Sequence, residues 1–366
     1  MINRHGHDTT LRDHERGGGE VGRGRLRGTM ETSAHGGWRI AQSVVLAGAV
    51  GVVLLLFVQP QFGLWLTWDL LIPMVPAVLL FVPQVWRNVC PIASVNQLPV
   101  LLGRSAARKP GHFVQRSAPA IAGLLLLAIV PLRLVLFNES GVALGLFVLT
   151  VLGVALAGGW FMSGKAGWCG TFCPLLPVER LYGQAPLIRI RHAHCAACSG
   201  CVRACYDLGP AASLGRLTGT RHARHGMAGL HRSPMGVFAA AFPGFVAGYF
   251  SAPVSPGLLQ AYGWVAGGAA LSAILFMAAQ RLAHLSSMSL TRLSAAAAIG
   301  IYYWFTAAAV AEAAHEMLSL PPPPVSGIAA ARAAAIAAAG IWLIVAARRA
   351  RVNGRLVQSG PTAPAG

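Results

Sequence analysis

Residues 141–162 read GVALGLFVLTVLGVALAGGWFM, a stretch without a single charged side chain. About 20 apolar residues are enough for a helix to cross the hydrocarbon core of a bilayer. Only 11% of the 366 residues are charged, against about 25% in a soluble domain. The chain is therefore predicted to be an all-α polytopic membrane protein. It has eight candidate spans of this kind, at 41–59, 62–83, 118–137, 141–162, 235–254, 257–279, 294–315 and 326–347.

Basic residues gather in alternate connections between these spans. The chain has 29 Lys and Arg against 11 Asp and Glu. Most of them lie in 84–116, 163–234, 280–293 and the segment after 347, while the opposite connections are short or lack them. By the positive-inside rule, both termini and all seven cysteines should face the cytoplasm from a cell (inner) membrane. The charge favours the anionic lipid surface of the bilayer as a partner, and no nucleic acid is expected.

The spans divide into two groups of four around a long basic connection. We expect a disordered basic N-terminal arm, a four-helix membrane half with a Cys-Pro loop, a cytoplasmic 4Fe–4S loop, a second four-helix half and a basic cytoplasmic tail. The boundaries are 1–36, 37–163, 164–234, 235–347 and 348–366. All seven cysteines precede the second half, so any metal chemistry is expected in the first three segments.

The long connection contains CAACSGCVRAC at residues 195–205. The C-x2-C-x2-C-x3-C spacing is the one by which bacterial ferredoxins bind a 4Fe–4S cluster. A reducing cytoplasm disfavours disulfides and leaves the thiols free for ligation. Zinc is the alternative metal, but structural zinc sites usually pair two short Cys units across a longer gap. An iron–sulfur cluster is thus predicted on Cys195, Cys198, Cys201 and Cys205.

A repeat places three further cysteines near this motif. Residues 86–98 read WRNVCPIASVNQL and residues 169–181 read CGTFCPLLPVERL, each after a two-span hairpin. The register pairs Cys90 with Cys173 and Trp86 with Cys169. Proline suits the first turn of a helix, so the preceding cysteine is expected at a helix N-terminus. There, backbone amides favour a thiolate and an anionic cluster.

Two ligand arrangements follow, and the sequence leaves both open. In the first, the four-cysteine motif holds a single cluster and the Cys-Pro cysteines are accessory, or inert buried thiols. In the second, ligands are shared as in two-cluster ferredoxins. Cys173 then completes the cluster begun by Cys195, Cys198 and Cys201. A second cluster is held by Cys205, Cys169 and Cys90, with one open position or a histidine such as His192 or His194.

These elements resemble the membrane polyferredoxins of the NapH/NosR/CcoG type over roughly residues 60–210. The resemblance rests on Cys90-Pro91, Cys169, Cys173-Pro174 and the four-cysteine motif. It implies membrane electron transfer: quinol oxidation, electron supply to periplasmic reductases, or maturation of copper oxidases. The chain departs from the family in having one full ferredoxin motif, Trp86 where a cysteine is expected, and Tyr206 where proline usually follows.

The expected function is electron transfer by a 4Fe–4S cluster between a cytoplasmic donor protein and a membrane acceptor, with quinone as the candidate acceptor. This would make the chain a component of a quinone-linked oxidoreductase. The alternative is a non-catalytic redox sensor or an assembly factor for a metalloenzyme. Both readings place the chemistry at the cysteines, because the last four spans contain none.

Ionisable and small residues inside the spans give secondary expectations. Asp69 and Arg133 lie at matching depths, which predicts a buried pair. Glu312 and His315 are one helical turn apart, a weak metal-ligand spacing, for which an interfacial ion pair is the favoured reading. Glycine pairs four residues apart predict close helix packing, at Gly141/Gly145, Gly244/Gly248 and Gly263/Gly267.

Overall fold

A computed structural model describes residues 30–108, 111–162, 164–188 and 233–358. Every regular element within these ranges is helical. Eight of the helical segments are long and apolar enough to cross a membrane: Gly37–Val58, Pro60–Phe81, Ser117–Phe137, Gly141–Phe161, Pro234–Ser251, Leu258–Leu282, Ser287–Met317 and Val325–Arg349. The predicted all-helical, eight-span architecture is confirmed. Of the predicted iron–sulfur loop at 164–234, residues 164–188 are described, and the four-cysteine motif lies outside the described residues.

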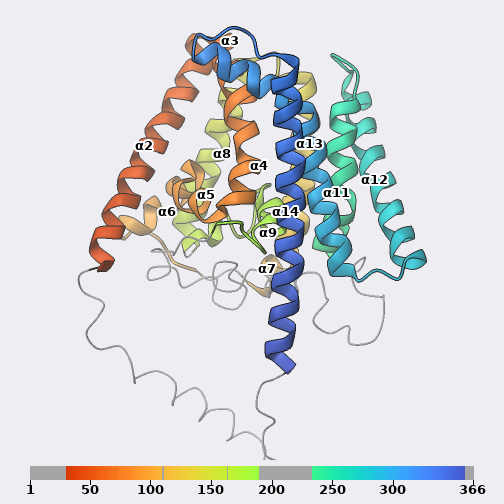
Figure 1. The fold of residues 1–366 in the computed structure, drawn as a ribbon. Helices are drawn as coiled ribbons and strands as arrows, with labels where there is room; N and C mark the ends of the chain where they lie inside the picture. The colour runs from red at the N-terminus through yellow and green to blue at the C-terminus, as the bar shows by residue number, and fades with distance from the viewer. Residues whose placement is uncertain (1–29, 109–110, 163, 189–232, 359–366) are drawn as a thin grey trace, which may run out of the picture.

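The first half consists of two hairpins, each followed by short helices (Figure 1). The first hairpin contains α2 (Met30–Val58), α3 (Pro60–Trp65), the π-helical turn η1 (Leu66–Leu71) and α4 (Ile72–Phe81), and is followed by α5 (Pro83–Val89) and α6 (Pro91–Leu101). The second contains α7 (His112–Leu132), the π-helical turn η2 (Arg133–Phe137) and α8 (Gly141–Phe161), and is followed by the 3-10 turn η3 (Gly164–Gly167) and α9 (Leu176–Tyr182).

The second half has four long helices. They are α11 (Pro234–Ser251), α12 (Leu258–Leu282), α13 (Ser287–Met317) and α14 (Val325–Gln358). Serine caps the N-termini of three membrane helices by accepting a hydrogen bond from a backbone N–H of the first turn. Ser140 accepts from Ala143 before α8, Ser233 from Gly236 before α11, and Ser286 from Ser289 before α13.

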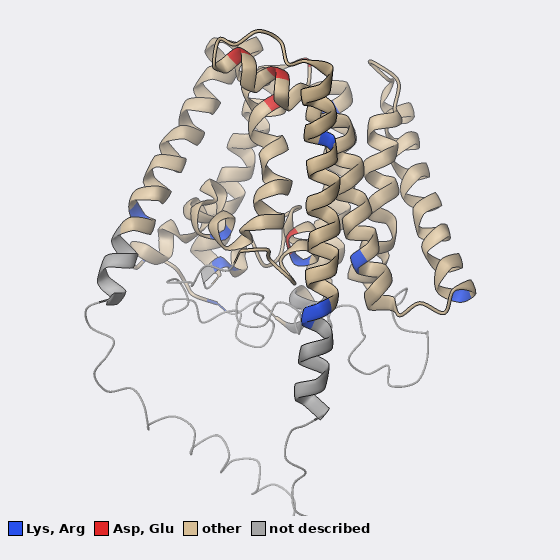
Figure 2. Cartoon of the chain, viewed as in Figure 1, with Lys and Arg blue, Asp and Glu red and all other residues tan. Residues whose placement is uncertain are grey.

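The two ends of the bundle differ in charge. We call the end at which α5, α6 and α9 lie the thiol end, because Cys90, Cys169 and Cys173 belong to this region. The opposite end is the α3 end. Figure 2 shows most acidic residues at the α3 end and most basic residues at the thiol end. The first described residues of α2 and the last described residues of α14 both lie at the thiol end (Figure 1).

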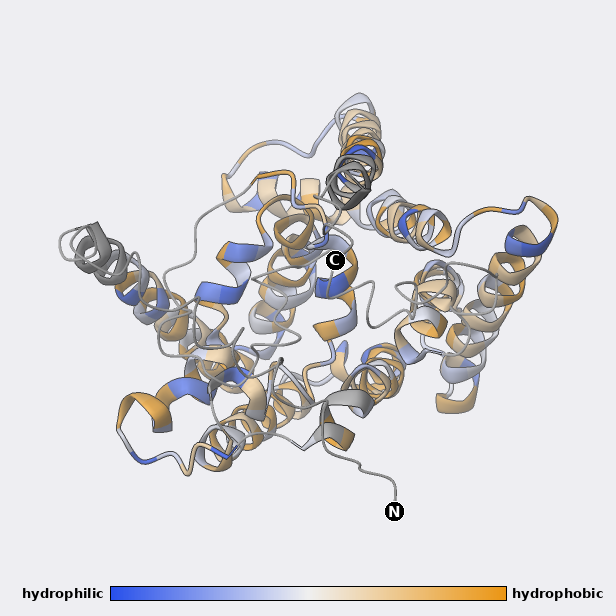
Figure 3. Ribbon diagram, turned by 90° about the horizontal axis from the view of Figure 1, so that it is seen from below, coloured by the Kyte–Doolittle hydropathy of each residue, from blue (hydrophilic) through white to orange (hydrophobic). Residues whose placement is uncertain are grey.

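Apolar side chains cover the outside of the bundle. Val58 is 75% exposed, Leu124 66% and Leu259 87%, which is the pattern of helices whose outer faces contact lipid. Figure 3 looks along the bundle from the thiol end and shows apolar residues along the peripheral helices. The bilayer environment predicted for the chain fits this surface.

The segments after α6 and α9 are exchanged between the two hairpins. After α6, the N–H groups of Ala106 and Arg108 donate to the carbonyls of Trp160 and Phe161 at the end of α8. After α9, the N–H of Ile188 donates to the carbonyl of Phe81 at the end of α4, at 2.9 Å. Each copy of the repeat therefore bonds to the last residues of the other copy's second span, which supports the predicted duplication.

Helix α9 is buried between the two halves of the molecule. All seven of its residues are buried. The Tyr182 hydroxyl donates to the carbonyl of Ala295 in α13 at 2.8 Å, and the Trp342 indole N–H of α14 donates to the Tyr182 carbonyl at 3.0 Å. The rings of Tyr182 and Trp342 meet edge to face. The cysteine-free second half thus forms the wall against which the second Cys-Pro element is packed.

Two of the three predicted glycine seams are confirmed. A Cβ on Gly244 would lie 1.9 Å from the Gly268 carbonyl oxygen, and one on Gly141 would lie 2.7 Å from that of Leu56. In the third pair, Gly263 and Gly267 face open space, so that prediction is wrong. The contact falls one position later along α12, at Gly268, where a Cβ would lie 2.3 Å from the Gly244 carbonyl oxygen.

Candidate functional site

Three thiols from two distant segments come together at the thiol end. Cys90 lies between α5 and α6, whereas Cys169 and Cys173 lie between η3 and α9. Each residue is partly buried. Cys173 interacts electrostatically with both Cys169 and Cys90, and Cys169 interacts with Cys90. We call Cys90, Cys169 and Cys173 the three-thiol group.

Cys90 occupies the predicted place at a helix N-terminus. Pro91 is the first residue of α6 and Cys90 is its N-cap residue. The Cys90 side chain makes no cap hydrogen bond, but the backbone N–H groups of Ile92 and Ala93 lower the pKa of its thiol. These amides have no partner inside the helix, so they favour the thiolate form. The prediction from the Cys-Pro pair is confirmed here.

Cys173 departs from that prediction. Helix α9 begins at Leu176, two residues after Pro174, because Pro177 also requires a place in the first turn of a helix. The thiol still accepts one hydrogen bond, from the Leu175 N–H. The loop before it is tightly turned, since the N–H groups of Phe172 and Cys173 both donate to the Trp168 carbonyl.

Glycines bring the Cys169 loop against the membrane helices. A Cβ on Gly167 would lie 2.1 Å from the Gly158 carbonyl oxygen of α8, and a Cβ on Gly158 would lie 2.5 Å from the Gly167 carbonyl oxygen. Thr171, 1% exposed, donates to the Ala166 carbonyl at 3.1 Å. The backbone that carries Cys169 is thereby fixed to the end of α8.

Three charged residues that were not predicted as site residues act electrostatically on the thiols. Arg87 of α5 forms an ion pair with Glu179 of α9. The Lys165 ammonium donates to the Arg87 carbonyl at 2.5 Å. A signal existed in the repeat, because the register that pairs Cys90 with Cys173 also pairs Asn96 with Glu179. Asn96 is buried too, and its side-chain amide donates to the Ala155 carbonyl of α8 at 2.8 Å.

Burial sets the protonation of the three thiols. It raises the pKa of Cys90, raises that of Cys169 to about 12, and raises that of Cys173 well above its usual range. Lys165 opposes this shift at Cys90 and Cys169, whereas Glu179 adds to it at all three thiols. Without a bound cation the thiols are neutral near pH 7. A metal or cluster would displace their protons, because thiolates are the ligating form.

The chemistry of the three-thiol group suits iron–sulfur ligation, but its geometry is not a closed ligand set. Among the described residues, no three His, Cys, Asp or Glu side chains are placed to hold a metal ion. The other four cysteines lie outside the described ranges, as do His192 and His194, so both ligand arrangements stay predictions. Comparison of the chain with protein-family models, curated proteins and solved structures finds no match.

Asp69 and Arg133, inside the membrane spans near the α3 end, do not have the predicted arrangement. Asp69 and Arg133 interact electrostatically, but the Arg133 guanidinium lies over the Trp68 ring, 4.2 Å from its centroid. Arg133 Nε donates to the Asn138 side-chain oxygen at 3.0 Å. The predicted Asp69–Arg133 contact pair does not form within the described residues, because an aromatic face and an amide satisfy the guanidinium instead.

The Glu312 and His315 pair also forms no metal site in the part of the chain described. The Nδ1 atom of His315 lies 2.5 Å from the Pro321 carbonyl oxygen, in the connection that follows α13. Arg332 of α14 lies over the Trp304 ring, 5.0 Å from its centroid. These contacts join α13 to α14 and its preceding loop, which is a structural role.

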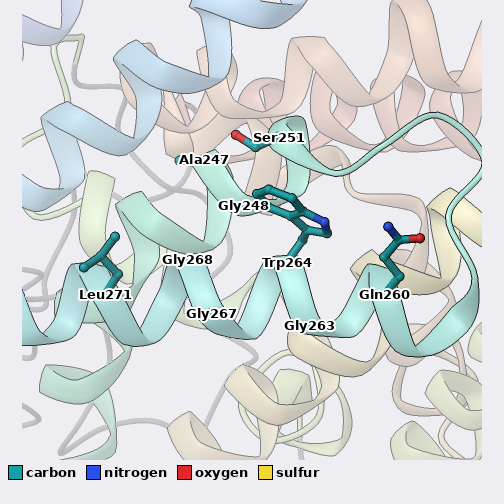
Figure 4. A pocket seen from close by; sticks show the side chains of 9 residues that line it. All are labelled: Ala247, Gly248, Ser251, Gln260, Gly263, Trp264, Gly267, Gly268 and Leu271. Atoms are coloured by element: carbon teal, nitrogen blue, oxygen red, sulfur yellow. The ribbon is translucent and has the colours of Figure 1, made fainter.

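A groove of about 560 Å³ lies between α11 and α12 (Figure 4). Trp264, Gln260 and Leu271 contribute its larger side chains, and the rest of the lining is small. None of the lining residues is charged or carries a thiol. The groove has none of the groups that redox or acid–base chemistry needs, so the three-thiol group is the better candidate site.

Proposed function

We propose that the chain is a membrane electron-transfer protein that carries a [4Fe–4S] cluster at its thiol end. It would pass single electrons between a soluble donor protein and an acceptor in the membrane, with quinone as the candidate acceptor. The observation that carries the proposal is the gathering of Cys90, Cys169 and Cys173 from two Cys-Pro elements, next to the segment that leads to the four-cysteine motif.

The anchor of that segment supports a shared site. Ile188, the last described residue before the motif, is hydrogen-bonded to Phe81 at the end of α4. Cys195 follows seven residues later, and seven residues span at most about 25 Å. Chain length therefore allows the four-cysteine motif to reach the thiol end, as the proposal requires. Cys195, Cys198 and Cys201 would ligate one cluster, completed by Cys205 or by Cys173.

The charge distribution supports the proposed orientation. Basic residues lie mainly at the thiol end (Figure 2), which the positive-inside rule places in the cytoplasm. A cluster at that end would meet reduced donors of the cytoplasm. The resemblance of the Cys-Pro elements to membrane polyferredoxins points to the same class of reaction, and the inner membrane is the proposed location.

A turnover assay tests this function. The full chain is purified without oxygen, placed in lipid vesicles and reduced with a chemical reductant, and a soluble quinone analogue is then added. We expect the cluster to be reoxidised, as followed by EPR. A Cys198→Ala variant should lose the main cluster signal. If neither quinone nor any other membrane acceptor reoxidises the wild-type cluster, electron transfer is rejected in favour of a sensor or assembly role.

The Cys90→Ala variant separates the two ligand arrangements. When one cluster uses the four-cysteine motif alone, this variant keeps the wild-type EPR spectrum. When Cys90 ligates a second cluster, the spectrum changes and iron is lost. The Cys169→Ala variant should give the same result as Cys90→Ala, because the shared arrangement places both cysteines on one cluster.

A further inference from the structure

Arg87 lies where the two Cys-Pro elements meet. It is three residues before Cys90, in α5. Both its side chain and its backbone carbonyl contact the second Cys-Pro element. Its guanidinium pairs with Glu179 of α9, and its carbonyl accepts from Lys165 of η3. Lys165 precedes Cys169 and Glu179 follows Cys173. One residue of the first element thus contacts both sides of the second element's cysteine loop.

The ion pair between Arg87 and Glu179 is largely shielded from solvent. The side chains of Arg87 and Glu179 are 12% and 10% exposed. A buried pair adds little stability relative to apolar residues of the same size, but removal of one partner leaves a charge without compensation. Such pairs fix the relative position of the elements that carry them. Here those elements are α5 and α9, which come from the two copies of the repeat.

The same residues act electrostatically on the thiols. The Lys165 and Arg87 cations and the Glu179 carboxylate all interact with Cys169. Together, the Lys165 and Arg87 cations and the Glu179 carboxylate carry a net charge of about +1. Thiolate-ligated clusters are anionic, and nearby cations and hydrogen bonds set their stability and potential. The residues that join the two elements therefore also carry charges that act on Cys169.

We propose that Arg87 is a positioning residue: through Glu179 and Lys165 it sets the position of the element that carries Cys90 relative to the element that carries Cys169 and Cys173. This inference rests on the proposed iron–sulfur function. It adds that a single arginine sets the relative position of the thiols from the two elements.

The test compares charge-neutral and charge-exchanged variants. In the wild-type protein, part of the iron and sulfide is expected to depend on the Cys-Pro cysteines. The Arg87→Gln and Glu179→Gln variants should each lose most of that part and show a changed EPR spectrum. The double variant Arg87→Glu with Glu179→Arg restores the pair in reverse and should recover iron and spectrum. Arg104→Gln removes an exposed arginine of the same end and serves as the matched control, with wild-type values expected.

A second readout does not depend on a cluster. Variants that keep only Cys90 and Cys169 are treated, in the full chain and without added iron, with a short bifunctional thiol reagent. We expect a Cys90–Cys169 cross-link, its loss on Arg87→Gln, and its return in the charge-exchanged variant. If a single variant fails to fold, Arg87→Lys, which keeps the charge, and the exchanged pair still decide the outcome.

The outcomes separate this inference from the proposed function. Wild-type iron, EPR spectrum and cross-linking in Arg87→Gln would overturn the role of Arg87. Absence of iron from the wild-type protein, together with an Arg87-dependent cross-link, would overturn the iron–sulfur function and keep the positioning role. Failure of the exchanged pair to recover either readout would show that pairing with Glu179 is not what Arg87 contributes.

Discussion

At the residue scale, burial and close backbone contact decide how each cysteine behaves. Two backbone N–H groups at the start of α6 lower the pKa of Cys90, whereas one lowers that of Cys173. Desolvation is nevertheless the largest influence on all three thiols. The resting state of the cluster-free site is therefore neutral, and its reactivity should depend steeply on pH.

Alkylation of the cluster-free protein should follow this pH dependence. Only the thiolate attacks a maleimide, and burial holds the pKa of Cys169 at about 12. We expect slow labelling of Cys169 at pH 7 and a rate that still rises above pH 9. Unfolding in denaturant provides the control, where the rate should level off near pH 8.5, the pKa of a free cysteine. A native rate that levels off there would contradict the assigned burial.

The same shift predicts alkaline destabilisation. A thiol with a raised pKa in the folded state contributes stability below its unfolded pKa, and this contribution is lost as the pH rises toward the folded value. We expect the melting temperature of the cluster-free protein to fall above about pH 8.5. The melting temperature of a Cys169→Ser variant should fall less steeply with pH, as measured by differential scanning fluorimetry in detergent.

Gly159 offers a test of the packing that supports Cys90. A Cβ on Gly159 would lie 1.8 Å from the Asn96 carbonyl oxygen of α6, whereas one on Gly153, in the same helix, would meet nothing within 4 Å. Overpacking costs about 1–3 kcal/mol, so Gly159→Ala should lower the melting temperature. Gly153→Ala should leave it unchanged or raise it. Equal melting temperatures for the two variants would contradict the α6–α8 contact.

At the element scale, local patterns were predictable and distant pairings were not. The apolar stretches correctly predicted the spans, and the Cys90-Pro91 pair correctly predicted the start of α6. The start of α9 was missed because two prolines, Pro174 and Pro177, compete for the first turn. The ion pair between Arg87 and Glu179 joins residues far apart in the sequence. Its formation depends on how two hairpins pack, which no local pattern encodes.

The contact between α9 and the second half makes a specific prediction. Trp342 is fully buried against Tyr182, while its neighbour Ile341 is 55% exposed. Truncation of a buried large aromatic residue costs about 3–5 kcal/mol. Trp342→Ala should therefore lower the melting temperature strongly and reduce cluster retention, whereas Ile341→Ala should do neither. Retention of the cluster in a destabilised Trp342→Ala protein would show that the second half does not support the site.

At the scale of the whole molecule, the number of spans and their limits followed from composition and length alone. Within the described residues, the helices begin and end within a few residues of most predicted limits. The role of the cysteine-free second half could not be predicted, because its apolar length, glycine pairs and few charged residues did not indicate what it packs against. The structure shows that α13 and α14 pack against α9. They thereby become part of the support of the three-thiol group.

The orientation of the molecule can be read from two new cysteines. Leu318 is exposed at the α3 end and Leu285 at the thiol end. In intact cells, a membrane-impermeant thiol reagent should label Leu318→Cys and should label Leu285→Cys only after permeabilisation, because basic residues keep the thiol end inside. The opposite labelling pattern would invert the proposed topology and place the thiols outside.

The measurement that tests the central claim most directly is the iron and acid-labile sulfide content of the full chain after anaerobic purification, combined with EPR of the reduced protein. We expect about four iron atoms per chain for one cluster, or about seven to eight for a coupled pair, with matching sulfide. We also expect a reduced-cluster spectrum that Cys198→Ala abolishes. A chain without iron and sulfide, or one that binds zinc in their place, would contradict that claim.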